Sequence, residues 1–165
     1  MRKFAIAAVA LSFVLAAAYP AYAIRIYGAT SIGNQTGNAT TLIDLGADLD
    51  SNDIGDTLEF NIKKKTTGII TFSAECSVEG SEESWISVQI LVNGTAVGQS
   101  NQTSDAFCSG TATDTSDDSW VMASMNIPYN FMPGNVDLQV QVSLHGGATG
   151  WWLGDTGVSV VVTKR

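Results

Sequence analysis

Apolar and polar residues alternate along most of the chain with a period of two, the pattern of a β-strand with one buried and one solvent-facing side. The alternation is clearest over residues 136–144, where Val and Leu alternate with Asp, Gln and Ser. The same period recurs over residues 58–62, 70–78, 86–92 and 121–127. Residues 158–162 are more continuously apolar, which favours a central strand buried on both faces.

Turn-forming residues separate these runs. Asn93-Gly94 lies between two apolar runs and predicts a tight hairpin turn. Pro133-Gly134-Asn135 separates two strands, and Gly146-Gly147 and Gly154-Asp155 break the C-terminal part. With two shorter runs at 24–27 and 41–45, the pattern predicts an all-β fold of about 8–10 antiparallel strands. We expect a β-sandwich or a jelly roll rather than an open sheet.

The first 23 residues have the features of a cleaved signal peptide. Met1-Arg2-Lys3 is basic, residues 4–18 are apolar, and Ala21-Tyr22-Ala23 is an Ala-x-Ala cleavage site. Removing 23 of the 165 residues leaves 142, about the size of one domain. Within it, residues 24–40 are expected to form a strand and a linker, and residues 41–165 the sandwich. The sequence therefore predicts a secreted protein, either periplasmic or extracellular.

The charge balance narrows the classes of partner. The chain has 8 Lys and Arg against 16 Asp and Glu, and the signal peptide removes two of the basic residues, so the net charge falls from −8 to −10. Nucleic acids and anionic membranes require basic surface, so neither is expected as a partner. No second apolar run reaches the ~20 residues of a membrane span. Lys63-Lys64-Lys65 is expected to form a turn or protect an edge strand, with anion binding as the alternative.

Cys76 and Cys108 are the only cysteines, so one intramolecular pairing is available. An oxidising compartment favours a disulfide, which would close a loop of 33 residues. The alternatives are a reactive thiol or a metal site. Residues 99–119 lack periodicity and are rich in Ser, Thr, Asp and Gly. We expect the disulfide to tie this long loop to a central strand at the edge of the core.

Several segments resemble C1q/TNF-like jelly rolls. Residues 67–74 carry Gly68 before two aliphatic residues and then Phe72-Ser73, as one strand of that family does. Residues 86–94 are similar to a strand that ends in Asn-Gly. Residues 125–144 are similar to a segment with Gly-Asp before an alternating strand, although Asn135 stands here in place of the Asp. The resemblance covers about residues 40–163 and implies a jelly roll that often forms trimers and binds ligands or other proteins.

A second resemblance is more local. Residues 72–76 read Phe-Ser-Ala-Glu-Cys and are followed later by Ala106-Phe107-Cys108. This arrangement is similar to that of small secreted bacterial proteins of uncharacterised function. It implies no specific ligand, because fold does not determine function.

An acidic stretch over residues 48–59 has oxygen-bearing side chains at alternate positions, as calcium ligands have. The candidate ligands are Asp48, Asp50, Asn52, Asp53 and Asp56. Asp53 stands where an EF-hand loop has Gly, and the flanks predict strands, so an EF-hand is not expected. The open alternatives are a simpler calcium-stabilised loop and a solvated acidic loop. No cofactor other than calcium is expected.

The four tryptophans are candidates for a ligand-binding surface. Trp85 and Trp120 fall opposite the apolar faces of their strands, and Trp151 and Trp152 are adjacent, so one of them must face each way. An exposed indole can stack on a sugar ring or pack against another protein. The alternative is that these side chains cover the outside of the sandwich or a subunit contact.

Catalytic chemistry has little support in the sequence. His145 is the only histidine, and it stands at the polar end of a strand before Gly146-Gly147, with no Gly-x-Ser-x-Gly motif to supply a nucleophile. No catalytic residue is therefore predicted. We expect a secreted, non-enzymatic binding or assembly module. Its partner would be a protein or a glycan, and the module could also associate with itself into a homo-oligomer such as a trimer. The alternatives are a structural subunit of a fibre, envelope or matrix, and a carbohydrate-binding or carbohydrate-active protein.

Overall fold

The computed structural model describes residues 23–46, 55–98, 106–109 and 120–164. Within these ranges all regular structure is β-strand, and the strands form two sheets. Sheet A contains β1 (Ala23–Ser31), β2 (Gln35–Gly37), β5 (Thr66–Glu79), β9 (Val121–Phe131) and β11 (Gly150–Lys164). Sheet B contains β3 (Thr41–Leu42), β4 (Thr57–Ile62), β6 (Trp85–Val92), β7 (Thr95–Val97), β8 (Cys108–Ser109) and β10 (Gly134–His145).

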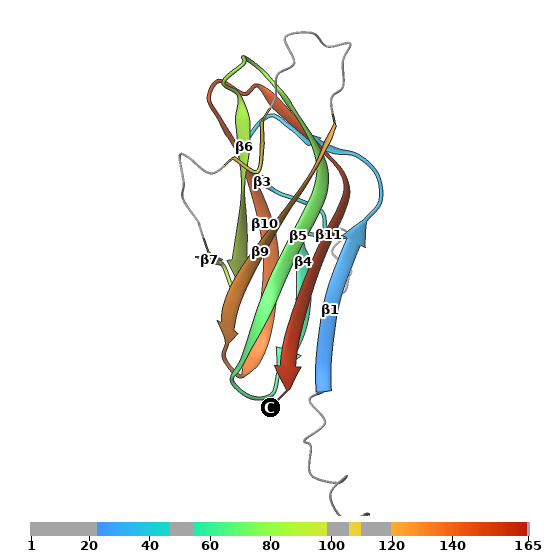
Figure 1. Ribbon diagram of the computed structural model, residues 1–165, viewed down its shortest axis with the longest axis vertical. Helices are drawn as coiled ribbons and strands as arrows, with labels where there is room; N and C mark the ends of the chain where they lie inside the picture. Colours follow the sequence, from blue (N-terminus) through green and yellow to red (C-terminus); the bar gives the residue numbers. More distant parts are fainter. Residues whose placement is uncertain (1–22, 47–54, 99–105, 110–119, 165) are drawn as a thin grey trace, which may run out of the picture.

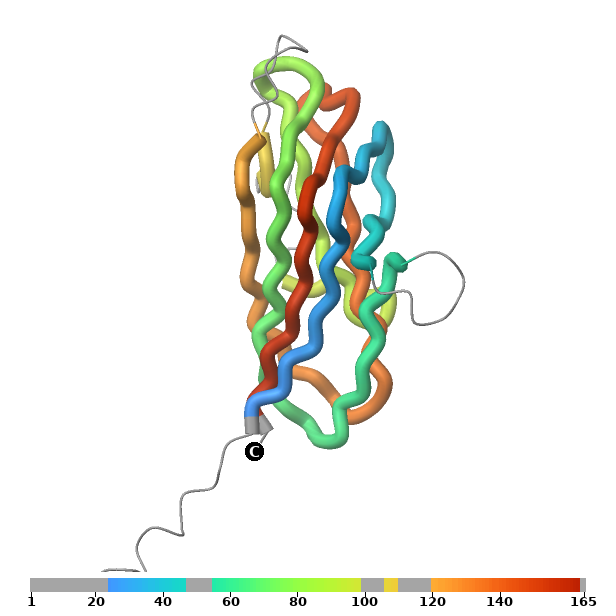
Figure 2. Tube along the Cα trace, turned by 90° about the vertical axis from the view of Figure 1, so that its right-hand side faces the viewer, coloured from blue at the N-terminus to red at the C-terminus, as the bar shows by residue number. Residues whose placement is uncertain are grey.

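The strands form an antiparallel jelly-roll sandwich, in agreement with the fold class expected from the sequence. Sheet A runs β1-β11-β5-β9, with β2 beside the start of β11, and Figure 2 shows these long strands side by side. Sheet B runs β3-β10-β6-β7, with β4 also on β10 and β8 on β6. Consecutive long strands alternate between the sheets from β4 to β6 and from β9 to β11, so each sheet is assembled from distant segments (Figure 1).

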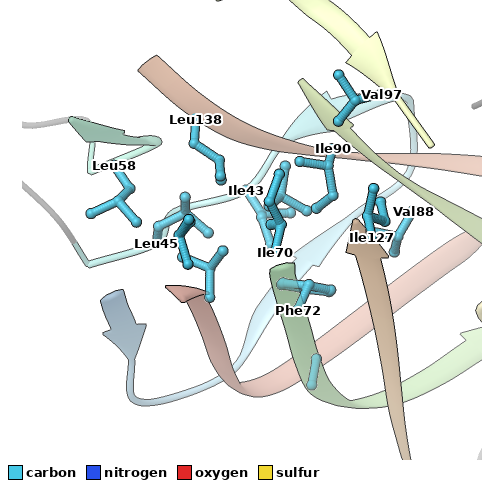
Figure 3. Packing of buried hydrophobic residues seen from close by; sticks show 14 of the residues in the cluster. Ile43, Leu45, Leu58, Ile70, Phe72, Val88, Ile90, Val97, Ile127 and Leu138 are labelled. Carbon is cyan, nitrogen blue, oxygen red and sulfur yellow. The ribbon is translucent and has the colours of Figure 1, made fainter. Parts of the chain in front are cut away.

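The core lies between the two sheets and is built from the alternate apolar residues. The pattern in β5 is regular, with Ile70, Phe72, Ala74, Cys76 and Val78 all buried. The facing residues of sheet B include Ile86, Ile90, Leu138 and Val140. Figure 3 shows side chains of both sheets meeting in this layer, joined by Ile43 and Leu45 from the segment after β3. Burial of these side chains is the main source of the fold's stability.

The predicted disulfide is present and links the two sheets. Cys76 belongs to β5 of sheet A and Cys108 to β8 of sheet B, with Cα atoms 6.4 Å apart. Both side chains are buried in the core cluster. The long loop expected at residues 99–119 lies largely outside the described residues, but the part around Cys108 pairs with β6.

The turn predictions have two different outcomes. Asn93 and Gly94 connect β6 and β7 with φ values of 51° and 73°, the conformation of a tight hairpin turn. Gly154-Asp155, in contrast, does not end a strand. The pairing of β11 with β5 shifts between Gly154 and Gly157, and Asp155 has φ of 42°, so this site is a β-bulge inside one long strand.

The N-terminal segment is part of the sandwich. All nine residues of β1 pair with β11, and β2 continues along the same strand, so residues 24–40 contribute an edge of sheet A where a strand and linker are expected from sequence. β1 begins at Ala23, and the predicted signal peptide otherwise lies outside the described residues. No helix among the described residues is long and apolar enough to cross a membrane.

Residues 158–162 form part of β11, which is central in sheet A, as the sequence predicts. Only one of its faces is buried, however. Val158, Val160 and Val162 point into the core, whereas Val161 is 36% exposed. No layer of the described chain covers the outer face of sheet A, so the continuous apolar pattern places a valine on the surface.

Candidate functional site

The four tryptophans separate into three environments. Trp151 points into the core and is 2% exposed, and its Nε1 donates to the carbonyl oxygen of Ala39 at 3.4 Å. Gly37 of β2 lies flat against this indole, because a Cβ at Gly37 would stand 2.6 Å from Trp151 Cζ2. Trp151 is therefore a packing residue and is not available at the surface.

Trp85 lies on the outer face of sheet B. Its indole stacks on the imidazole of His145, its cross-strand partner, with ring centroids 4.0 Å apart and planes 15° from parallel. His145 Nε2 is 2.9 Å from Ser87 Oγ. Among the described residues no carboxylate is hydrogen-bonded to His145, so the third member of a catalytic triad is missing there. The three side chains form a cross-strand packing unit.

Trp152 and Trp120 share the outer face of sheet A, and we call them the tryptophan pair. Trp152 points outward because its neighbours Trp151 and Leu153 are buried. Trp120 reaches the same strand two residues further along, since a Cβ on Gly154 would lie 3.4 Å from Trp120 Cζ3. The same point lies 3.1 Å from Asn34 Oδ1 and 3.4 Å from Glu75 Oε2. An amide and a carboxylate thus flank the aromatic surface, and both indoles are only partly buried.

A second feature of the same face is a line of apolar side chains across the sheet. Ile26, Val161, Ile69 and Pro128 are successive cross-strand partners on β1, β11, β5 and β9. We call these four residues the apolar row. Ile26 is 69% exposed and Ile69 is 50% exposed, and Ile24 (62% exposed) extends the row on β1. Large apolar side chains gathered in this way mark contact surfaces more often than scattered ones do.

Small and polar residues lie on both sides of the apolar row. Thr71 and Asn126 form one cross-strand hydrogen bond of 2.7 Å, and Thr67 and Asn130 form another of the same length. Gly28 and Ser159 continue the Thr71 line toward β1. The outer face of sheet A is therefore apolar along one line and carries small or polar residues on both sides of it, which suits contact with another protein surface.

The apolar row was not predicted from the sequence, although a signal for it exists. Ile69 stands in the polar phase of β5, next to Ile70 in the buried phase. Ile26 and Val161 likewise stand opposite the buried phases of their strands. Each looks like an isolated exception in the sequence, and only the register across three strands brings them together.

Most of the candidate calcium ligands lie outside the described residues. Asp48, Asp50, Asn52 and Asp53 are not described, whereas Asp56 is partly buried and accepts a hydrogen bond of 3.0 Å from Thr57 Oγ1. Among the described residues no group of three His, Cys, Asp or Glu side chains is placed to hold a metal ion. Calcium binding at this loop stays a prediction.

The fold and its outer faces define an antiparallel jelly-roll sandwich with a disulfide between its sheets. No protein-family model matches the sequence, and no curated protein sequence matches it. One similar solved structure is a mutant VP2 protein of infectious bursal disease virus, with 15% identity and a TM-score of 0.44 over 85% of this chain. The chain spans only 32% of that viral protein. Another is a family 35 carbohydrate binding module from Clostridium thermocellum, with 15% identity and a TM-score of 0.32 over 84% of this chain and 97% of the module.

Proposed function

We propose that this protein is a secreted, non-enzymatic binding or assembly module, and that the outer face of sheet A is its contact surface. The observation that carries the proposal is the apolar row, in which exposed Ile26, Val161 and Ile69 lie side by side on three adjacent strands. Covering such side chains with a partner removes apolar area from water and favours association. The buried disulfide is compatible with the oxidising compartment of a secreted protein.

Self-association is the form of assembly that we expect first. A stable contact between two proteins buries about 800 Å² on each partner. The apolar row crosses all four long strands of sheet A, so a contact centred on it would extend across the whole width of that face. The resemblance to C1q/TNF-like jelly rolls adds the expectation of a closed trimer. A structural subunit of a fibre, envelope or matrix is the alternative, and it would give an open-ended polymer instead.

The test compares oligomeric state across matched variants. Mass photometry and sedimentation velocity of the purified protein should show a closed oligomer at micromolar concentration. Ile69→Asp and Ile26→Asp should shift it to monomer with little change in melting temperature, because both side chains are already exposed. Gln141→Asp on the outer face of sheet B adds the same charge and should leave the oligomer intact. A monomer at every concentration, or equal effects of all three variants, would contradict self-assembly through this face.

A glycan partner is the second candidate, and the tryptophan pair favours it. Two half-buried indoles beside Asn34 and Glu75 combine a stacking surface with hydrogen-bonding groups, as sugar recognition requires. Binding to a glycan array should be lost in Trp152→Ala and kept in Trp85→Ala, because Trp85 lies on the other sheet. Loss in both variants, or in neither, would remove the tryptophan pair as a glycan site. A carbohydrate-active enzyme stays the third alternative, and a cleft with two carboxylates about 5–10 Å apart would support it.

A further inference from the structure

The basic residues that the structure describes gather at one end of the sandwich. Lys63, Lys64 and Lys65 form the turn between β4 and β5, and Arg25 lies near the start of β1. Lys164, at the other end of the sequence, pairs through its backbone with Ala23 at the same place. Figure 1 shows the start of β1, the end of β11 and the β4–β5 turn together at the lower end. Apart from Arg165, which is not described, these are all the Lys and Arg residues after position 23.

The opposite end is acidic. Glu79 at the end of β5 and Glu82 and Glu83 in the turn that follows it are all exposed. This turn lies at the upper end of the molecule in Figure 1. The strongly negative net charge therefore conceals a positive end, which a count over the whole chain does not show.

A pocket of about 330 Å³ opens at the basic end. Arg25, Lys63, Lys64 and Lys65 all line it, and none of its lining residues is acidic. Arg25 lines the pocket because it lies two residues from Tyr27 on β1, so both side chains are on the side of the strand that faces the other sheet. Four like charges around one opening repel each other, and an anion placed among them relieves that repulsion.

The floor of the pocket is apolar. Ile62 and Val162 contribute side chains that are 4% and 3% exposed, and Tyr27 stacks on Phe60 with ring centroids 4.4 Å apart. Two of the hydroxyl groups in the lining, those of Tyr27 and Thr66, are already engaged. Tyr27 donates to the carbonyl oxygen of Asn61 at 3.3 Å, and Thr66 donates to the carbonyl oxygen of Thr163 at 2.6 Å. Pairing with a charged group is left to the cations at the rim, because Arg25 and Lys63–Lys65 are the charged residues of the lining.

From this geometry we infer that the pocket binds a small amphipathic anion: a short apolar group that contacts Ile62, Val162 and Tyr27, ending in a carboxylate held by Lys63–Lys65 and Arg25. The volume lies at the lower end of the range of about 300–1,000 Å³ for small-molecule sites, which suits a ligand of modest size. The inference is independent of the contact surface proposed for sheet A, because the pocket lies at the end of the sandwich.

Titration calorimetry with simple probes tests both halves of the inference. Octanoate should bind the purified protein at least tenfold more tightly than octanamide, and octyltrimethylammonium should not bind. Across acetate, butanoate, hexanoate and octanoate, affinity should rise about two- to fourfold for each methylene added to the chain. Equal binding of octanoate and octanamide would overturn the assignment of the carboxylate to the basic residues. An affinity that does not rise with chain length would overturn the assignment of the apolar group to the pocket floor.

Two sets of variants locate the site. Replacing all three exposed lysines, as in K63Q/K64Q/K65Q, should weaken octanoate binding at least about fivefold while the melting temperature stays within a few degrees. Glu82→Gln with Glu83→Gln changes the charge at the far end and should leave the affinity within about twofold. Unchanged binding in the lysine variant would place octanoate elsewhere. An increase in the glutamate variant equal to the loss in the lysine variant would show a general charge effect and overturn the pocket assignment.

Discussion

Removing the disulfide should destabilise the protein by about 3–4 kcal/mol, because the bond restricts the unfolded chain. Cys76 and Cys108 are 32 positions apart, and closing a loop of that length lowers the conformational entropy of the unfolded chain by the equivalent of about 3–4 kcal/mol. The protein has the size of a single domain, for which each kcal/mol corresponds to about 2–4 °C in melting temperature. The melting temperature should therefore fall by about 10 °C in C76A/C108A.

Urea unfolding of the oxidised protein, the reduced protein and C76A/C108A gives the measurement. Reduction opens the loop and keeps both sulfur atoms, whereas the alanine variant also removes two buried sulfurs. The alanine variant should therefore be the less stable of the two by up to about 1 kcal/mol. A loss below about 1 kcal/mol on reduction, with an unchanged dependence on urea, would refute the loop-entropy argument for this bond.

Three further predictions concern packing and metal binding. Gly37→Ala should cost about 1–3 kcal/mol in urea unfolding, because the new Cβ would meet the Trp151 indole at 2.6 Å, and a neutral result would mean that β2 can move aside. Trp151→Ala should cost about 3–5 kcal/mol, whereas Trp85→Ala on the outer face should cost about 1 kcal/mol or less, and similar losses would contradict the burial difference. Millimolar calcium should raise the melting temperature by several degrees through the loop that ends at Asp56, and a chelator should reverse this; no shift would remove the calcium hypothesis.

The fold class could be predicted because period-two alternation reports directly which face of each strand is buried. In β5 every predicted buried position is buried, and in β10 all are buried except Leu144, which is only partly buried at the end of the strand. The alternation also identified Trp151 and Trp152 as facing opposite ways. It could not say which of them points inward, because that depends on the pairing of β11 with β2 and β5.

Sites that depend on how distant strands pair could not be predicted from the sequence. Arg25 and Lys63–Lys65 line one pocket only because β1 and β4 meet at one end of the sandwich. Val161 illustrates the opposite difficulty. Its apolar neighbours predicted burial on both faces, but the burial of a strand face depends on whether another layer covers it, which local composition does not encode.

The pairing of β1 with β11 also has a mechanical consequence. Ala23 pairs with Lys164, so the outer ends of the two strands lie next to each other. A force that pulls these two points apart would load the hydrogen bonds of the pair one after another, as in a zipper, and β1 should peel away at low force. A pull between Ala23 and the far end of the molecule would load the whole ladder in shear, and the same strand should resist far more strongly. The direction of attachment, more than the free energy of unfolding, would then decide how well this protein bears load.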